Sequence, residues 1–340
     1  MSGGSKVVDR VDRRRFLGAA GAGLGGLTFG CRSRAKAGQL VLRLSHSMAA
    51  GPTSLDVMAQ KFREIVEART AGAVKVQVFP NGSLGQEREI VQQIQEGLLD
   101  LMVSGTAIWG SVAPKIQVLD FPFLWRDQGH VHAAIDGAVG REATDYLEKA
   151  ARIRALAWMD SFGFRQVITR ARDITDPRQL AGLKLRTIQS PIYVKAVELM
   201  GASPTPMAFG EIYTSLQTGV IDGYEHDAST TLQMRFYEVA RFMARTCHIA
   251  GVLGLWISSA TLARLPPGVR ATLEQAALEA GGHQRAMGPP EDLRATEQLK
   301  AQGMTVREID RQVFLPAAEK LWAIQARELD AEPWLKAIRG

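Results

Sequence analysis

Arg186 has the chemistry that is easiest to state in this sequence, because it ends the short alternating run Gly182–Arg186 (GLKLR). An arginine guanidinium is planar and charged, and it can donate two parallel hydrogen bonds to one carboxylate. His226, in Gly223–Asp227 (GYEHD), is a second candidate because imidazole can titrate near neutral pH. The alternatives are an ordinary ion pair for Arg186 and a core or solvent-facing side chain for His226.

The elements around Arg186 follow from local signals. The alternation in Leu183–Arg186 predicts a strand, and Pro191 can begin a helix that stops at Gly201. Two prolines at 204–206 predict an extended crossing, and a second helix is expected over 211–217. This pattern is typical of an α/β domain whose strand ends surround a cleft.

The preceding half of the chain predicts a similar unit. Strands are expected at 40–44, 74–79 and 99–103, with one helix capped by Ser54 and another carrying apolar residues over 90–98. The alternation of strand and helix predicts a parallel sheet, with ligands at the carboxyl ends of its strands.

The later chain is expected to pass between two domains. A crossing strand is predicted at 155–158, and a strand at 251–258 returns to the first domain. From Pro266 onward the chain is predicted to be helical. Two crossings between domains describe a hinge that can close over a ligand.

The charge and the leader bear on location. The chain has 340 residues with 41 basic and 35 acidic side chains, but outside residues 1–37 the two kinds number 33 each, which leaves no basic stripe for nucleic acid.

Residues 13–17 (RRRFL) and the Gly/Ala-rich run after them match a twin-arginine export signal, with cleavage expected after Ala37. That run is too short and too glycine-rich for a stable membrane span. Export to the periplasm is therefore predicted, with lipid attachment at Cys31 or a disordered basic tail as alternatives. Cys247 is then the only cysteine left, so no intramolecular disulfide is expected.

The longer motifs resemble the solute-binding subunits of TRAP transporters, the DctP family. The similar stretches are FPNGSLGQERE (79–89), LDFPFLW (119–125), GLKLR (182–186), GASPTPMAFGEIYTSLQTGVIDG (201–223) and RFYE (235–238). The resemblance runs from about residue 40 to 245. It implies a protein that captures an organic acid outside the inner membrane and delivers it to a membrane permease, with no cofactor, no metal and no catalytic residue.

The resemblance also implies roles for particular residues. The family's GLK-hydrophobic-R arginine binds the ligand carboxylate, and Arg186 stands at that position. Arg165 matches a second arginine that contacts the ligand, and Phe209 matches a ring that packs on its carbon skeleton; a structural ion pair and a core position are the alternatives. His226 replaces a more frequent Asn and is expected to donate a hydrogen bond to a second acid or hydroxyl group. Further ligand contacts are expected from first-domain loops, namely from His46, Met48, Gln86 and Thr106.

The predicted fold class is α/β and periplasmic-binding-protein-like, with two α/β domains, a hinge and a ligand cleft between them. Domain I is expected to comprise 38–160 and about 250–290, and domain II about 161–249 and 291–340. A C4-dicarboxylate or a sugar acid is the expected ligand. One alternative is the binding protein of an ABC-type importer. The other is an exported enzyme acting on an organic acid, although no G-x-S-x-G, H-E-x-x-H or G-x-x-x-x-G-K motif is present.

Overall fold

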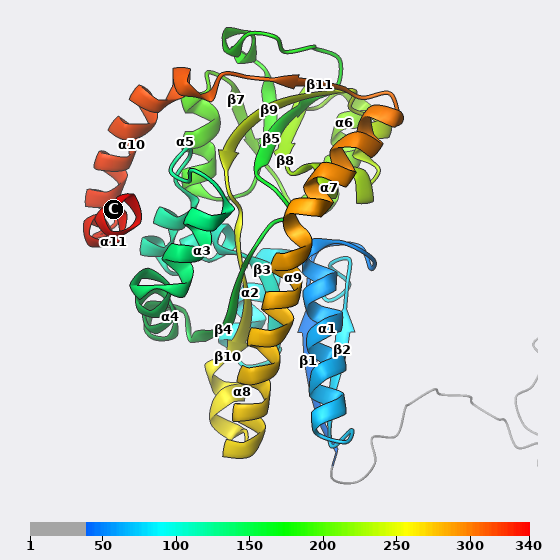
Figure 1. The fold of residues 1–340 in the computed structure, drawn as a ribbon, viewed down its shortest axis with the longest axis vertical. Helices are drawn as coiled ribbons and strands as arrows, with labels where there is room; N and C mark the ends of the chain where they lie inside the picture. Colours follow the sequence, from blue (N-terminus) through cyan, green and yellow to red (C-terminus); the bar gives the residue numbers. More distant parts are fainter. Residues whose placement is uncertain (1–38) are drawn as a thin grey trace, which may run out of the picture. The chain divides into compact units, whose positions relative to one another are not determined.

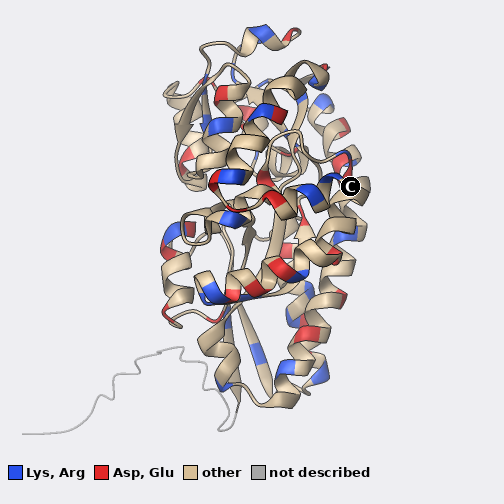
Figure 2. Ribbon diagram, turned by 90° about the vertical axis from the view of Figure 1, so that its left-hand side faces the viewer, with Lys and Arg blue, Asp and Glu red and all other residues tan. Residues whose placement is uncertain are grey.

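The computed structural model describes residues 39–340 (Figure 1). The predictions for the export signal and for Cys31 lie outside these residues. Within 39–340, no helix is both long and apolar enough to cross a membrane. Lys and Arg residues are interspersed with Asp and Glu residues along the ribbon (Figure 2).

The first sheet has five strands in the order β2-β1-β3-β10-β4. Its strands are β1 (Leu40–Ser45), β2 (Val74–Phe79), β3 (Leu101–Gly105), β4 (Ile153–Asp160) and β10 (Val252–Ser258). β1 pairs in parallel with β2 and β3, which confirms the parallel unit predicted from the alternation of strand and helix. β10 lies antiparallel between β3 and β4, as a strand returning from the other half of the molecule must.

The second sheet has six strands in the order β11-β9-β5-β8-β6-β7. Its strands are β5 (Arg165–Thr169), β6 (Lys184–Thr187), β7 (Ser203–Pro206), β8 (Gly223–His226), β9 (Phe242–Ile249) and β11 (Thr305–Glu308). β6, which carries Arg186, is held in parallel between β7 and β8. β7 contains Pro204 and Pro206 and lies at the sheet edge, where a missing backbone N–H removes no essential ladder hydrogen bond.

Helices cover both sheets and join them (Figure 1). They are α1 (Ser54–Arg69), α2 (Glu87–Gln95), α3 (Gln128–Asp136), α4 (Ala138–Ala151), α5 (Pro191–Leu199), α6 (Ile212–Thr218), α7 (Ala228–Gln233), α8 (Ser259–Arg264), α9 (Pro267–Ala301), α10 (Leu315–Glu328) and α11 (Glu332–Arg339). α9 runs for 35 residues with Pro289 and Pro290 inside it. Before these prolines Glu279 accepts from Arg69 of α1, and after them Glu291 accepts from Ser229 of α7. One helix therefore contacts elements that belong to both halves of the fold.

The chain passes between the two sheets three times, from β4 to β5, from β9 to β10 and from α9 to β11. The sequence predicted the first two as crossing strands, and the boundary expected at about 290 between domains I and II implied the third. The last two helices contact α4 and the 3₁₀ turn Pro114–Asp120, which precede β4 in the chain. The domain boundaries expected from the sequence remain a prediction.

Two local expectations differ from the structure. Thr53, not Ser54, caps α1, because its hydroxyl accepts from the backbone N–H of Asp56. Leu98 follows the end of α2 and is 58% exposed, since the helix stops before the residue can face the sheet.

Candidate ligand-binding site

A cavity of about 50 Å³ is lined by residues from both sheets. The first-sheet half contributes residues from the ends of β1 and β3, the start of α2 and the start of β10. The second-sheet half contributes residues from β5, β6, α5 and β8 and from the loops beside them. The lining consists of Ser47, Met48, Leu55, Glu87, Gly105, Ala107, Ile108, Ser161, Arg165, Arg186, Ile188, Tyr193, Phe209, His226, Gly251, Val252 and Leu253. This location follows from the topology, because loops at the carboxyl ends of parallel strands meet at one edge of a sheet.

Arg186 reaches this cavity from the middle of β6 and is 1% exposed. Its Nε and Nη2 donate to the backbone oxygen of Met207, at 3.2 and 2.9 Å. Its Nη1 is buried and has no hydrogen-bond partner among the described residues. Burial, together with the nearby charge of Arg165, lowers the pKa of Arg186 to about 10, although Glu225 and Glu87 favour its charged form. Arg186 is therefore a desolvated cation with a donor still to be satisfied.

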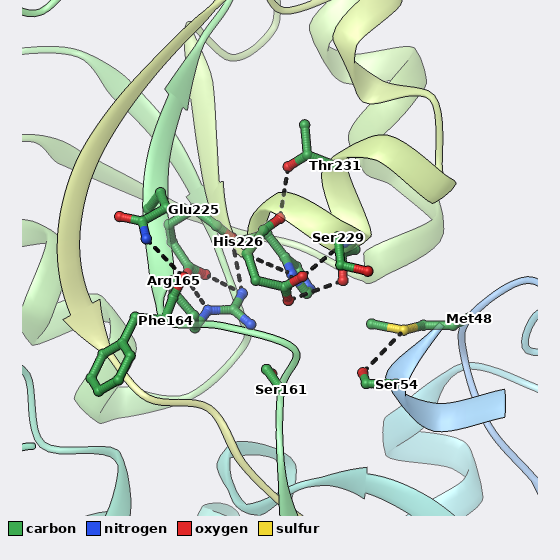
Figure 3. Close-up of polar contacts among 12 residues, drawn as sticks. Met48, Ser54, Ser161, Phe164, Arg165, Glu225, His226, Ser229 and Thr231 are labelled. Atoms are coloured by element: carbon green, nitrogen blue, oxygen red, sulfur yellow. Dashed lines mark hydrogen bonds and ion pairs between the residues drawn. The ribbon is translucent and has the colours of Figure 1, made fainter. Parts of the chain in front are cut away.

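Arg165 begins β5 and is paired with Glu225 on the neighbouring strand β8 (Figure 3). Its Nε and Nη2 both donate to the Glu225 carboxylate, and Nη2 also donates to the Glu225 backbone oxygen at 2.9 Å. Burial alone would raise the pKa of Glu225, but Arg165 and His248 lower it to about 2. The guanidinium carbon also lies 5.3 Å from the ring centroid of Tyr193. Arg165 therefore forms a structural ion pair with Glu225 and also lines the cavity.

His226 ends β8, and its ring centroid lies 5.6 Å from that of Phe209. Its Nδ1 is 2.8 Å from Oδ2 of Asp227. Burial would raise the pKa of Asp227, but His226 and the backbone N–H of Thr230 lower it, so Asp227 is an ionised acceptor. Burial and Arg165 lower the pKa of His226, so the imidazole is neutral at pH 7. The backbone N–H of Asp227 also donates to Nδ1, at 3.0 Å, and this bond places the imidazole proton on Nε2, whereas donation from Nδ1 to the Asp227 carboxylate places it on Nδ1. The donor role expected of His226 from the sequence stays a prediction.

The other predicted residues divide into two groups. Met48 lines the cavity beside Leu55, and Gln86 lines an adjoining pocket that also includes Arg186 and Phe209. His46 and Thr106 are buried but do not lie on the lining. His46 faces Asp56, with Nε2 3.1 Å from its carboxylate, and the Thr106 hydroxyl donates to Asp120 at 2.8 Å. Both side chains are therefore buried behind the cavity lining to which they were expected to belong.

Sequence reasoning missed four polar residues of the lining, namely Ser47, Glu87, Ser161 and Tyr193. Glu87 is the first residue of α2, and its Oε1 accepts from the hydroxyl of Ser47 at 2.9 Å. Tyr193 lies on α5, and its hydroxyl is 3.4 Å from the Asp120 carboxylate. The signal for Glu87 was its place at the end of the loop 81–87, where a strand-end contact was already expected. Tyr193 had no such signal, since its spacing on α5 matched that of core residues.

Among the described residues, no three His, Cys, Asp or Glu side chains gather so as to hold a metal ion. The cavity lining combines apolar side chains with a few charged and polar groups from both sheets. Guanidinium donors come from the second sheet, and the carboxylate acceptor comes from the first.

Two α/β sheets joined by repeated crossings, with a cavity lined by both halves, are the architecture of periplasmic solute-binding proteins of known structure. Residues 44–328 match the model of the DctP family, "Bacterial extracellular solute-binding protein, family 7", and the chain belongs to this family. It is a solute-binding protein of the TRAP type, as the motifs predicted.

Relatives with known names or structures are similar over most of their length. The 2,3-diketo-L-gulonate-binding periplasmic protein YiaO of Escherichia coli K12 is 33% identical over 265 residues, which are 78% of this chain and 80% of that protein. The TRAP solute-binding protein of Polaromonas sp. JS666 bound to D-erythronate has a TM-score of 0.84 and 30% identity, over 89% of this chain and 99% of that one. The Citrobacter koseri protein with bound D-glucuronate has a TM-score of 0.83 and 30% identity, over 88% and 99%.

Proposed function

We propose that this protein captures an organic acid anion, a sugar acid or a C4-dicarboxylate, through Arg186 and delivers it to a TRAP membrane permease. The observation that carries the proposal is the buried Nη1 of Arg186, which lacks a partner among the described residues. A buried donor left unpaired costs stability, so a protein that keeps one is expected to use it. A ligand carboxylate at this position would satisfy Nη1 and neutralise the desolvated charge.

Arg165 has a supporting role in this proposal. Its pairing with Glu225 fixes the guanidinium in the lining, and none of its hydrogen bonds uses Nη1. A ligand oxygen can therefore accept from Nη1 without breaking the ion pair. Phe209 and Met48 supply apolar contact for the carbon skeleton, on opposite halves of the cavity.

Ligand entry requires the two halves to separate, because the cavity holds only about 50 Å³, little more than a water or two. Two hydrogen bonds beside the cavity link the first-sheet half to the second-sheet half. Nη2 of Arg88 on α2 donates to the backbone oxygen of Gln189 at 2.8 Å. The Tyr193 hydroxyl donates to the carboxylate of Asp120 at 3.4 Å. We infer that these contacts break on opening and re-form around the ligand, which removes water from the site.

The location follows from the family and the leader together. Family members are extracytoplasmic solute-binding proteins, and we propose that the twin-arginine motif at 13–17 directs export of this one. Replacing Arg14 and Arg15 with lysine should then retain the protein in the cytoplasm. Normal export of that variant would contradict the route without affecting the binding proposal.

A thermal-shift screen tests the binding proposal directly. The purified protein is heated with C4-dicarboxylates, 2-oxo acids, uronates and other sugar acids, aromatic acids and amino acids. A ligand at 100 times its Kd stabilises the folded state by roughly 2.7 kcal/mol, which raises Tm by several degrees. A shift confined to one class of acid supports the proposal and names the ligand class. No shift with any acid would contradict carboxylate binding at Arg186, and turnover of a bound acid would indicate an enzyme instead.

A further inference from the structure

Glu87 is an acidic side chain in a cavity expected to receive an anion. It lines the same space as Arg165 and Arg186, but it comes from α2 on the opposite half of the molecule. Ser47 donates to Oε1, whereas Oε2 accepts no hydrogen bond from a described residue. No described Lys, Arg or His nitrogen lies within 4.0 Å of its carboxylate, so Glu87 is not neutralised by a salt bridge of its own.

The charges around the cavity nearly cancel before a ligand enters. Arg165 is balanced by Glu225, and His226 is neutral and paired with Asp227. Arg186 can take one carboxylate. A ligand with a second carboxylate would bring that negative charge toward Glu87, in a site where little water remains to screen it.

The free carboxylate oxygen of Glu87 indicates what the rest of the ligand must offer. Glu87 Oε2 is an acceptor without a donor from the described residues. A hydroxyl group donates one hydrogen bond, whereas an ionised carboxylate donates none. A hydroxyl on the ligand chain or ring would therefore satisfy Oε2, and a second carboxylate would leave it unpaired.

We propose that Glu87 is a specificity-determining residue that selects monocarboxylate sugar acids and rejects dicarboxylates, by accepting hydrogen bonds from ligand hydroxyl groups and repelling a second acid group. This inference rests on the proposed function, since it assumes that Arg186 holds the first carboxylate. Burial raises the pKa of Glu87, although Ser47, Arg186 and Arg165 oppose the shift, and a hydroxyl donor would stabilise its charged form.

The test compares D-gluconate with D-glucarate by isothermal titration calorimetry at pH 7.5. The two acids differ only at one end, where gluconate has a hydroxymethyl group and glucarate a second carboxylate. The wild-type protein is expected to bind gluconate at least about tenfold more tightly, since one hydrogen bond to a charged group is worth roughly ten- to a hundredfold in affinity. The Glu87→Gln variant removes the charge and keeps the shape, and it should narrow this preference by about tenfold.

Glu96→Gln is the matched control, because Glu96 caps the other end of α2 and is exposed to solvent. It removes the same charge from the same helix and should leave the preference unchanged. Equal or tighter binding of glucarate by the wild-type protein would overturn the proposal, and so would an unchanged preference in Glu87→Gln. If the protein binds C4-dicarboxylates through Arg186 but neither hexose acid, this inference is wrong and the proposed function stands. If no anion binds at all, both are wrong.

Discussion

Replacing Arg186 with methionine is expected to weaken ligand binding strongly while leaving the ligand-free fold nearly as stable as before. A pKa of about 10 in place of 12.5 means that holding this buried charge costs the folded protein about 3 kcal/mol at pH 7. The sign follows because the folded state binds the proton less tightly than the unfolded state does, so the charged side chain destabilises the fold. Methionine removes this cost and fills most of the same volume.

The substitution also removes two hydrogen bonds to the backbone oxygen of Met207, each worth about 1 kcal/mol. The two effects oppose one another. The free energy of unfolding of the ligand-free protein should therefore change by less than about 2 kcal/mol. Urea denaturation measures this quantity directly.

Binding should respond very differently to the same change. Truncating one partner of a buried, hydrogen-bonded charge pair costs about 2–5 kcal/mol, which lowers affinity on the order of 30- to 5,000-fold. Calorimetry with the acid identified by thermal shift measures the loss. Arg178→Met is the control, because the Arg178 side chain is 90% exposed and paired only with Asp176. If Arg186→Met binds with wild-type affinity but loses more than about 3 kcal/mol of stability, Arg186 is a structural residue and the reasoning fails.

Three further predictions concern the neighbouring residues. Arg165→Met should lower the free energy of unfolding by about 3–5 kcal/mol even without ligand, because it leaves Glu225 charged and buried without its partner; a loss below about 1 kcal/mol in urea would contradict the ion pair. The pKa of Glu225 is depressed to about 2 from 4.5, so it contributes about 3 kcal/mol that is present above pH 4.5 and lost as pH falls toward 2. Glu225→Gln should therefore be less stable at pH 7 yet lose less stability between pH 5 and 3, and parallel pH profiles of Tm would argue against this. Gly163→Ala should lower stability by about 1–3 kcal/mol, since Gly163 has φ +138° and an added Cβ would meet the Asp292 carboxylate; an unchanged Tm would show that this turn relaxes freely.

Local patterns were sufficient to predict most of the elements that carry the site. The alternation before Arg186 and the proline at 191 correctly predicted β6 and the start of α5, because strand period and helix start depend on neighbouring residues alone. The prolines of β7 predicted extended backbone for the same reason. The end of α2 was less predictable, because the helix expected to carry Leu98 stops at Gln95 and leaves Leu98 58% exposed.

The sequence by itself determined the fold class, the family and the placement of Arg186 at a strand that faces the cavity. Only the tertiary structure decided which charges neutralise one another. Arg165 and Glu225 are 60 residues apart and meet because β5 and β8 pair in one particular register. Thr106 turns toward Asp120 whereas its neighbour Ala107 lines the cavity, since successive residues leave a strand end in different directions. Glu87 and Arg186 line the same cavity only because the tertiary structure brings two sheets together around it. No local sequence pattern specifies that contact between distant parts of the chain.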